Sequence, residues 1–247
     1  MRPGIHSAVV LAFATTAFAT SPAGASIGCD PGTDGDDRIE CSAADDVHLG
    51  DPGADLVLGF EGDDRLAGGS GADRIFGQVG IDVLVGDEGR DRVGGGSGSD
   101  SLSGSRGRDH LTGSTGGDAL RGDGGRDRLT GGPDDDQMKG GDGDDRVHGG
   151  DGDDIVNGNA GSDVLEADTG DDRLRGRRGP DDLRGGEGND DLDGGAGADT
   201  LHAGRGADSI TVADGRPDTV RCGRGADTVR ADSIDEIAPD CETVETA

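Results

Sequence analysis

Aromatic side chains are almost missing from this chain of 247 residues, which has no Trp, no Tyr and four Phe. Large aromatic side chains usually supply much of the apolar area that a core buries. This protein therefore cannot build an ordinary aromatic core. Its 52 glycines add to the entropy lost on folding, because glycine is the costliest residue to order.

Positive charge is also scarce. The chain has 23 Lys and Arg against 53 Asp and Glu, a formal net charge of −30. Such a chain repels nucleic acids and anionic membrane surfaces, so neither is expected as a partner. The basic residues are almost all arginine, a bias that weakly indicates a bacterial source.

Beyond residue 25 the chain has no apolar run long enough to cross a bilayer, so membrane insertion is not expected. Residues 1–25 are typical of a secretory signal peptide, with a basic start, an apolar run over residues 8–19 and a small-residue end. A lipoprotein signal ending at Cys29 is the alternative, although Ser26 stands where an aliphatic residue is normally found. We therefore expect a secreted, extracellular bacterial protein.

What the chain does contain is one phrase of nine residues, G-G-x-G-x-D-x-U-x, where U is aliphatic. Its clearest copies are GGDGDDRVH (Gly140–His148) and GGDGDDIVN (Gly149–Asn157). U recurs every nine residues from Val57 to Ile210, which makes 18 copies in register. Asp stands two residues before U in every copy, and Gly stands four residues before U in all but one, where Asp134 replaces it. A period this strict indicates one structural unit stacked on itself.

Each phrase combines a turn with a very short strand. The first six residues are typical of a turn, whereas x-U-x predicts a strand of about three residues with U on a dry face and its neighbours on a wet one. Two such strands per coil would use about 18 residues, with coils about 4.8 Å apart. The pattern predicts an all-β solenoid of two sheets with about nine or ten coils.

Stacked coils would place each Asp above the Asp of the neighbouring coil. Such a file of carboxylates repels itself unless a cation neutralises it. Calcium fits best, because it takes about six to eight oxygen ligands from carboxylates and backbone carbonyls. Magnesium prefers a tighter octahedron, and zinc and copper prefer His or Cys, which the phrase lacks.

The phrase resembles the hemolysin-type calcium-binding nonapeptide of RTX proteins, a calcium-binding β-helix repeat. The resemblance covers about two-thirds of the chain. It implies a right-handed parallel β-roll in which Ca²⁺ ions lie between successive turns, held by the sixth-position Asp and by loop carbonyls. The implied carboxylate ligands are Asp55, Asp64, Asp73, Asp82, Asp91, Asp100, Asp109, Asp118, Asp127, Asp136, Asp145, Asp154, Asp163, Asp172, Asp181, Asp190, Asp199 and Asp208. The implied carbonyl ligands in the clearest copies are Gly140, Gly141, Gly143, Gly149, Gly150 and Gly152.

Several copies depart from the phrase, and we expect weaker or missing ions there. The departures are Arg177, Arg178 and Pro180 in one copy, Ile81 and Asp134 in loop positions, and Ala167 and Ala203 in place of first-position glycines. The fullest occupancy is expected over residues 140–157.

Four cysteines lie near the two ends of the predicted rod. Two of the three possible pairings would join ends tens of ångströms apart, which disulfide geometry forbids. We therefore predict the disulfides Cys29–Cys41 and Cys222–Cys241, each stapling an end cap of the kind that solenoids need. Zinc binding is the alternative, but an exported chain without a CxxC cluster favours disulfides.

The predicted organisation is a signal peptide (1–25), an N-terminal cap with a degenerate repeat (26–49), the β-roll (50–211), and degenerate repeats with a C-terminal cap (212–247). We expect a calcium-binding structural module that folds on binding several Ca²⁺ ions. The alternative is an adhesin, or a module that binds a cell-surface, matrix or glycan partner, although the outer strand positions show no aromatic stripe and no threonine ladder. An enzyme is not expected, because the histidines of the repeats fall at outward positions and no nucleophile elbow is recognisable.

Overall fold

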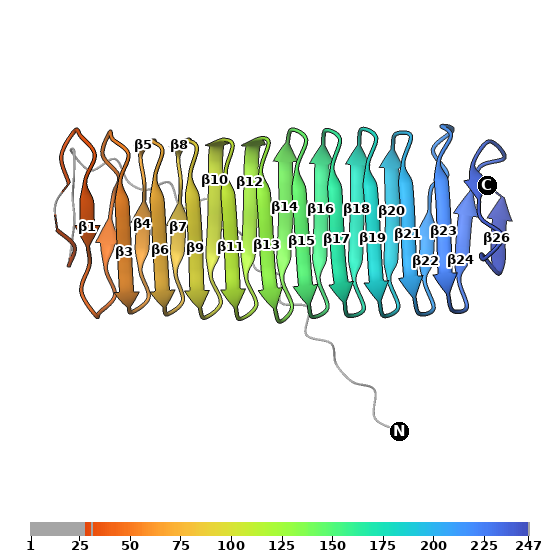
Figure 1. Cartoon of the computed structure of the whole chain (residues 1–247), viewed down its shortest axis with the longest axis horizontal. Helices are drawn as coiled ribbons and strands as arrows, with labels where there is room; N and C mark the ends of the chain where they lie inside the picture. Colours follow the sequence, from red (N-terminus) through yellow and green to blue (C-terminus); the bar gives the residue numbers. More distant parts are fainter. Residues whose placement is uncertain (1–27, 31, 247) are drawn as a thin grey trace, which may run out of the picture.

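The nine-residue period becomes strand-and-turn units that wind from one end of a rod to the other (Figure 1). In this computed structural model, residues 28–30 and 32–246 are described, and none of them is helical. The signal peptide expected at residues 1–25 lies outside the described residues. Within that described part, no helix has the length and hydropathy to cross a bilayer.

The strands alternate between two parallel sheets. Sheet 1 has 12 strands in the order β1 (Arg38–Glu40), β3 (Leu56–Glu61), β6 (Arg74–Val79), β9 (Arg92–Ser97), β11 (His110–Thr115), β13 (Arg128–Pro133), β15 (Arg146–Asp151), β17 (Val164–Thr169), β19 (Asp182–Glu187), β21 (Thr200–Arg205), β23 (Thr219–Arg224) and β25 (Glu236–Ile237). Sheet 2 has 14 strands, of which the main path is β2 (Val47–His48), β4 (Arg65–Ala67), β7 (Val83–Val85), β10 (Ser101–Gly107), β12 (Ala119–Gly125), β14 (Gln137–Asp142), β16 (Ile155–Ala160), β18 (Arg173–Arg178), β20 (Asp191–Ala196), β22 (Ser209–Thr211), β24 (Thr228–Ala231) and β26 (Thr243–Thr246). The short strands β5 (Ser70–Gly71) and β8 (Glu88–Gly89) lie beside this path.

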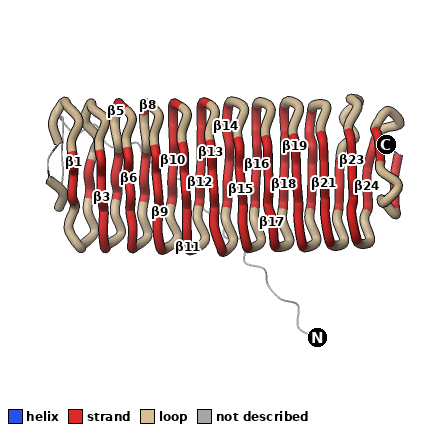
Figure 2. Tube along the Cα trace, in the orientation of Figure 1, coloured by secondary structure: helices blue, strands red, loops and turns tan. Residues whose placement is uncertain are grey.

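One coil consists of two phrases, one strand in each sheet. In sheet 1, Leu111 is paired with Val93 on one side and with Leu129 on the other, so strand partners are two phrases apart in the sequence. Figure 2 shows the strands running across the rod, with loops at both edges where the chain passes between the sheets. The predicted all-β solenoid of two sheets, with two phrases in each coil, is confirmed.

The core is a file of aliphatic side chains between the two sheets. The U residues are almost completely buried, as Leu129 at 1% and Met138 at 0% exposure illustrate. Their neighbours on each strand face outward, as the alternating burial of β11 and β13 shows. Because each side chain packs against U residues of its own and neighbouring coils, one continuous core runs the length of the repeats.

The strands are longer than the three residues predicted from x-U-x. Most of them have six residues, because they continue through the first three positions of the next phrase. The first-position glycine continues the alternation and faces the interior, as Gly113 does in β11. Without a side chain the glycine fits there, and pairing with the adjacent coil goes on past it, for example between Gly132 and Gly150.

The solenoid also extends beyond the copies that are in register. β1 pairs with β3 at the same spacing as the regular repeats, and β21 pairs with β23 at a spacing that is one residue longer (Thr200 with Thr219). β26 then extends sheet 2 by pairing with β24. The prediction of about nine or ten coils is therefore too low. Ordered coils reach into both segments expected to be caps, because changes in spacing are absorbed in loops.

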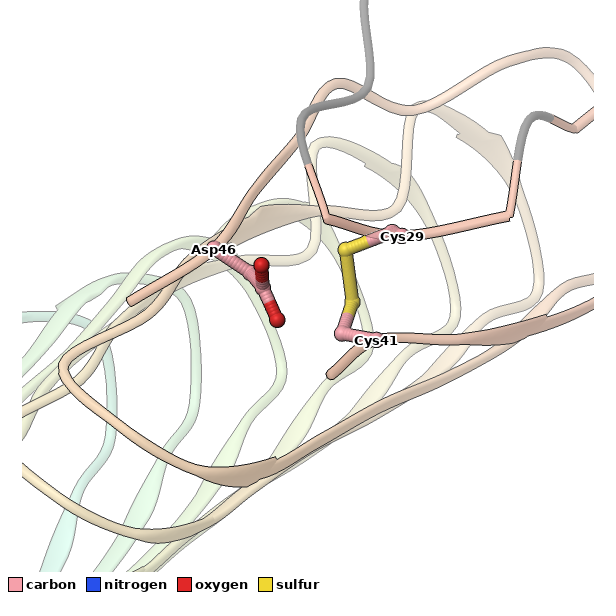
Figure 3. A group of neighbouring side chains, drawn as sticks. All are labelled: Cys29, Cys41 and Asp46. Atoms are coloured by element: carbon pink, nitrogen blue, oxygen red, sulfur yellow. A yellow bond between two sulfur atoms is a disulfide. The ribbon is translucent and has the colours of Figure 1, made fainter. Parts of the chain in front are cut away.

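Both predicted disulfides are present. Cys29 is bonded to Cys41 at the end of the rod where β1 lies (Figure 3), and Cys222 in β23 is bonded to Cys241. The sulfur of Cys29 is thus engaged, which does not agree with the lipoprotein and zinc alternatives. Loops of this size contribute about 3 kcal/mol each in the chain-entropy model.

Core packing gives a first prediction. Leu129→Ala should lower the free energy of unfolding by about 2–5 kcal/mol, because the buried file has no means of closing the cavity. Thr130→Ala, at the next and outward-facing position, should change it by about 0.5 kcal/mol or less. Denaturant unfolding in saturating calcium measures both. Equal effects of the two substitutions would contradict the continuous core.

Candidate metal sites

The sixth-position aspartates form two buried files, one along each edge of the rod. Each of these residues ends a turn and immediately precedes a strand, for example Asp109 before β11 and Asp118 before β12. All 18 predicted aspartates are at most 3% exposed. Each nine-residue phrase therefore places one carboxylate in the interior of the rod, and each coil, which has two phrases, contributes two.

A hydrogen-bond ladder orders each file. The backbone N–H of Asp109 donates to Oδ1 of Asp127 at 2.7 Å, and the N–H of Asp127 donates to Oδ1 of Asp145 at 2.8 Å. The same bond, from one coil to the next, repeats along both files. One carboxylate oxygen of each aspartate is therefore satisfied by the backbone of the preceding coil.

The second carboxylate oxygen is not satisfied. Oδ2 is buried and has no hydrogen-bond partner in any of the 18 aspartates. A buried polar atom without a partner is rare in proteins and destabilises the fold, the more so when the group is charged. Two rows of oxygens that lack a donor therefore lie inside the rod.

Burial raises the pKa of these carboxyls. The pKa of Asp136 is raised to about 8, and those of Asp91 and Asp118 to about 7, with desolvation as the main cause. Amide donors from the preceding coil lower the pKa, and neighbouring aspartates raise it further. The repulsion between stacked carboxylates that the sequence predicts therefore adds to a larger effect, the loss of hydration.

In many copies a backbone carbonyl approaches the same point as the orphaned oxygen. If Gly122 carried a Cβ, that atom would lie 2.5 Å from Oδ2 of Asp127 and 2.5 Å from the carbonyl oxygen of Gly140 on the next coil. The same convergence recurs at Gly131, where Oδ2 of Asp136 and the carbonyl of Gly149 approach the same point. A side chain at the first position would crowd these oxygens, which explains why glycine stands there in every copy except those with Ala167 and Ala203.

The donors in this place are hard oxygens from carboxylates and carbonyls, which fit calcium and do not fit zinc or copper. Of the glycines predicted to contribute carbonyls, Gly140 and Gly149 lie at the convergence points. The carbonyls of Gly143 and Gly152 instead lie against fourth-position glycines of the next coil. Gly141 and Gly150 adopt positive φ values of 120° and 124° at the second position.

The departures from the phrase fall into two groups. Ile81, Asp134, Arg177, Arg178 and Pro180 are exposed, so their side chains lie outside the files, and Asp181 keeps its ladder bond. Ala167 and Ala203 are completely buried at the first position, where the methyl group takes the space that glycine leaves open. Weaker calcium binding at these copies stays a prediction, and the structure favours the two alanines as its strongest cases.

Three members of the files lie outside the 18 copies. Asp46, Asp218 and Asp227 are equally buried, and Asp218 accepts the N–H of Asp199 at 2.7 Å. The motif Gly225–Val229 marks Asp227 in the sequence, and Asp218 stands two residues before the aliphatic Val220 in a copy whose spacing is one residue longer. Asp46 is satisfied locally, because Ser42 donates to it through its N–H at 2.6 Å and through its hydroxyl.

Three side chains of metal-ligating type also meet near the N-terminal end. Among the residues that the structure describes, Cys29, Cys41 and Asp46 are grouped within 4.8 Å (Figure 3). The two sulfurs are joined in a disulfide and Asp46 is held by Ser42. This group is therefore part of the end cap.

Comparison with known proteins agrees with this geometry. The family model of the RTX calcium-binding nonapeptide repeat matches residues 42–75, 58–93, 67–102, 94–129, 130–165, 166–201 and 175–210. No curated protein matches the chain. The chain belongs to the RTX calcium-binding nonapeptide-repeat family, whose repeats generally bind calcium and build structure rather than catalyse reactions.

The convergence of oxygens at the first-position glycine gives a second prediction. Gly122→Ala should reduce the number of bound Ca²⁺ ions by about one, or weaken one site by about tenfold, because the new methyl group displaces an oxygen ligand. Gly124→Ala in the same strand is the matched control, since its Cβ would meet no atom closer than 3.7 Å. Calorimetric titration measures both, and identical curves for the two variants would count against ligands at this position.

The raised pKa values give a third prediction. A carboxyl whose folded pKa exceeds its unfolded pKa stabilises the calcium-free fold at low pH and loses that contribution as the pH rises through the folded value. Without calcium, the chain should therefore gain ordered structure as the pH falls from about 8 towards about 4. In calcium the dependence should reverse, because protons compete for Oδ2. Far-ultraviolet circular dichroism against pH measures this, and a calcium-free chain that unfolds further in acid would refute it.

Proposed function

We propose that this protein is a secreted structural module whose β-roll folds when Ca²⁺ ions bind between successive coils, with the sixth-position aspartates and first-position carbonyls as ligands. The observation that carries this proposal is the set of buried Oδ2 atoms without partners. Each of these oxygens can bind a cation, and without a cation it destabilises the fold. Metal binding and folding then form a single equilibrium.

The charge of the chain supports the same conclusion. A net charge of −30 opposes compaction, and bound Ca²⁺ ions would offset much of it. Extracellular calcium modules bind their ions with dissociation constants of about 10⁻⁴–10⁻³ M. A chain with such sites would stay unfolded where calcium is scarce and fold where calcium is plentiful, so export itself would trigger folding.

The two disulfides fit an extracellular location, because such bonds persist in oxidising compartments. They lie near the ends of the rod, where calcium sites have a neighbouring coil on one side only. We infer that the disulfides hold the terminal coils and that calcium holds the coils between them.

The experiment compares the mature chain with and without calcium. In a chelator it should give a disordered circular dichroism spectrum and rapid proteolysis, and excess calcium should restore the β spectrum and protection. Asp127→Asn should raise the calcium concentration at the folding midpoint, because it removes one buried ligand charge. Asp142→Asn, at an exposed position of the same repeat region, is the charge-matched control. A chain that stays compact and protease-resistant in the chelator would overturn the proposal.

A role as an adhesin or as a module that binds a cell-surface component requires an outer surface suited to a partner. One observation favours such a role, a row of arginines on sheet 1.

A further inference from the structure

The outer face of sheet 1 carries a row of four arginines and one histidine in a strongly acidic chain, and burial together with the neighbouring arginines lowers the pKa of the histidine, His110. The first residues of β6, β9, β11, β13 and β15 are Arg74, Arg92, His110, Arg128 and Arg146, and each is the direct partner of the next. The spacing along the row is that of the strands, about 4.8 Å. Sheet 2 has no such row, since most of the same positions there hold uncharged residues, for example Val83, Ser101 and Ala119.

A second row lies beside the first. Arg90, Arg108 and Arg126 occupy the turns that lead into β9, β11 and β13, two residues before the first row. The two rows line a groove of about 630 Å³. We call this surface the arginine strip, consisting of Arg74, Arg90, Arg92, Arg108, Arg126, Arg128 and Arg146 with His110.

The strip has almost no counter-ions of its own. In the part of the chain that the structure describes, Arg126 forms an ion pair with Asp144, and the other arginines of the strip form none. The aspartates that line the groove are buried file residues, and of these described residues none forms an ion pair with an arginine of the strip. Like charges directly opposite each other in a sheet destabilise it. An external polyanion would relieve this repulsion.

A shallow apolar depression adjoins the strip. It has a volume of about 290 Å³ and is lined by Phe76, Gly94 and the polar side chains Gln78, Thr112 and Ser114. Phe76 is 36% exposed and lies over Gly94, whose missing side chain leaves the ring face open. Arg92 and His110 border both the depression and the groove, so the two features form one continuous surface.

We propose that this surface binds a linear acidic glycan, with the arginine strip contacting its carboxylate or sulfate groups and Phe76 packing against the face of one sugar ring. Guanidinium groups pair with such anions through charge-assisted bidentate hydrogen bonds. A sugar ring is about as long as the spacing between coils, so a glycan with one charge per ring can follow the straight rows. Hydroxyl and amide side chains around the depression supply partners for sugar hydroxyls.

Duplex DNA fits the strip less well. It carries about one charge per 1.7 Å of helix axis, on two strands that wind around that axis, whereas the strip is straight and has wider spacing. The negative charge of the rest of the chain would repel any polyanion, so we expect binding only when calcium has neutralised the aspartate files.

The test uses the full mature chain in calcium, with folding checked by circular dichroism. The probe is a chondroitin sulfate oligosaccharide, compared with a neutral dextran oligosaccharide and with duplex DNA of equal length. Arg92→Gln combined with Arg128→Gln should weaken chondroitin sulfate binding by about tenfold or more. The matched control, Arg65→Gln combined with Arg173→Gln, removes two exposed arginines from the same repeat position on sheet 2 and should change the affinity by less than about twofold.

Phe76→Ala separates sugar recognition from simple charge attraction. It leaves the charge unchanged and should weaken glycan binding by about threefold to tenfold while leaving any residual DNA binding unchanged. Failure of the folded, calcium-loaded chain to bind chondroitin sulfate, or equal weakening by the two double variants, would overturn the proposal. DNA binding as tight as glycan binding would overturn the glycan assignment in favour of a general polyanion surface.

Discussion

The structure depends on a repeated aspartate in which only one of the two carboxylate oxygens has a hydrogen-bond partner. Each file carboxylate accepts the backbone N–H of the preceding coil through Oδ1, so it fixes the stacking of the coils, and it leaves Oδ2 buried without a donor. The same residue therefore stabilises the stacking of the coils through Oδ1 and destabilises the fold through the unpartnered Oδ2. Because desolvation is the main cause of the raised pKa values, the missing partner must replace water, and either a proton or a divalent cation can do so. Calcium, with its preference for carboxylate and carbonyl oxygens, would do this at neutral pH.

The strictness of the repeat follows from that arrangement. The first position holds glycine, or alanine in two copies, because Oδ2 and a carbonyl of the next coil lie where a Cβ would be, as at Gly122. Fourth-position glycine is favoured because φ is positive there and the carbonyl of the preceding coil lies beneath it, as that of Ala44 lies beneath Gly62; Asp134, with a φ of 84°, is the exception. The second position also has positive φ but faces outward, so Phe60 and Arg177 are tolerated despite the strain. Whether a glycine can be replaced therefore depends on how closely the neighbouring coil packs against it, and not on the turn conformation alone.

Much of the fold could be predicted from the sequence, because the aliphatic and aspartate positions repeat without a slip. The period alone yields two sheets, a buried file and the disulfide pairing. It could not show that strands extend through the glycines, since their pairing depends on the neighbouring coil. Asp218 stands two residues before the aliphatic Val220, as in the regular copies, but a one-residue change in spacing moves it out of phase while the loop restores its position in space. The sequence also could not predict that Oδ2 lacks a hydrogen-bond partner, because hydrogen bonds between coils are visible only in three dimensions.

The arginine strip could not be recognised from the sequence for a related reason. Arg92 and Arg128 look like scattered polar residues there, because the nine-residue period mixes positions from both sheets. In the folded chain every second phrase shares a sheet, so the period that matters for the surface is twice that of the phrase. Inner positions are constrained by stacking in every coil, whereas outer positions are free to differ between the two sheets and along the rod. A calcium-dependent scaffold can thus carry a binding surface on one face over a few coils without any change in the residues that hold the coils together.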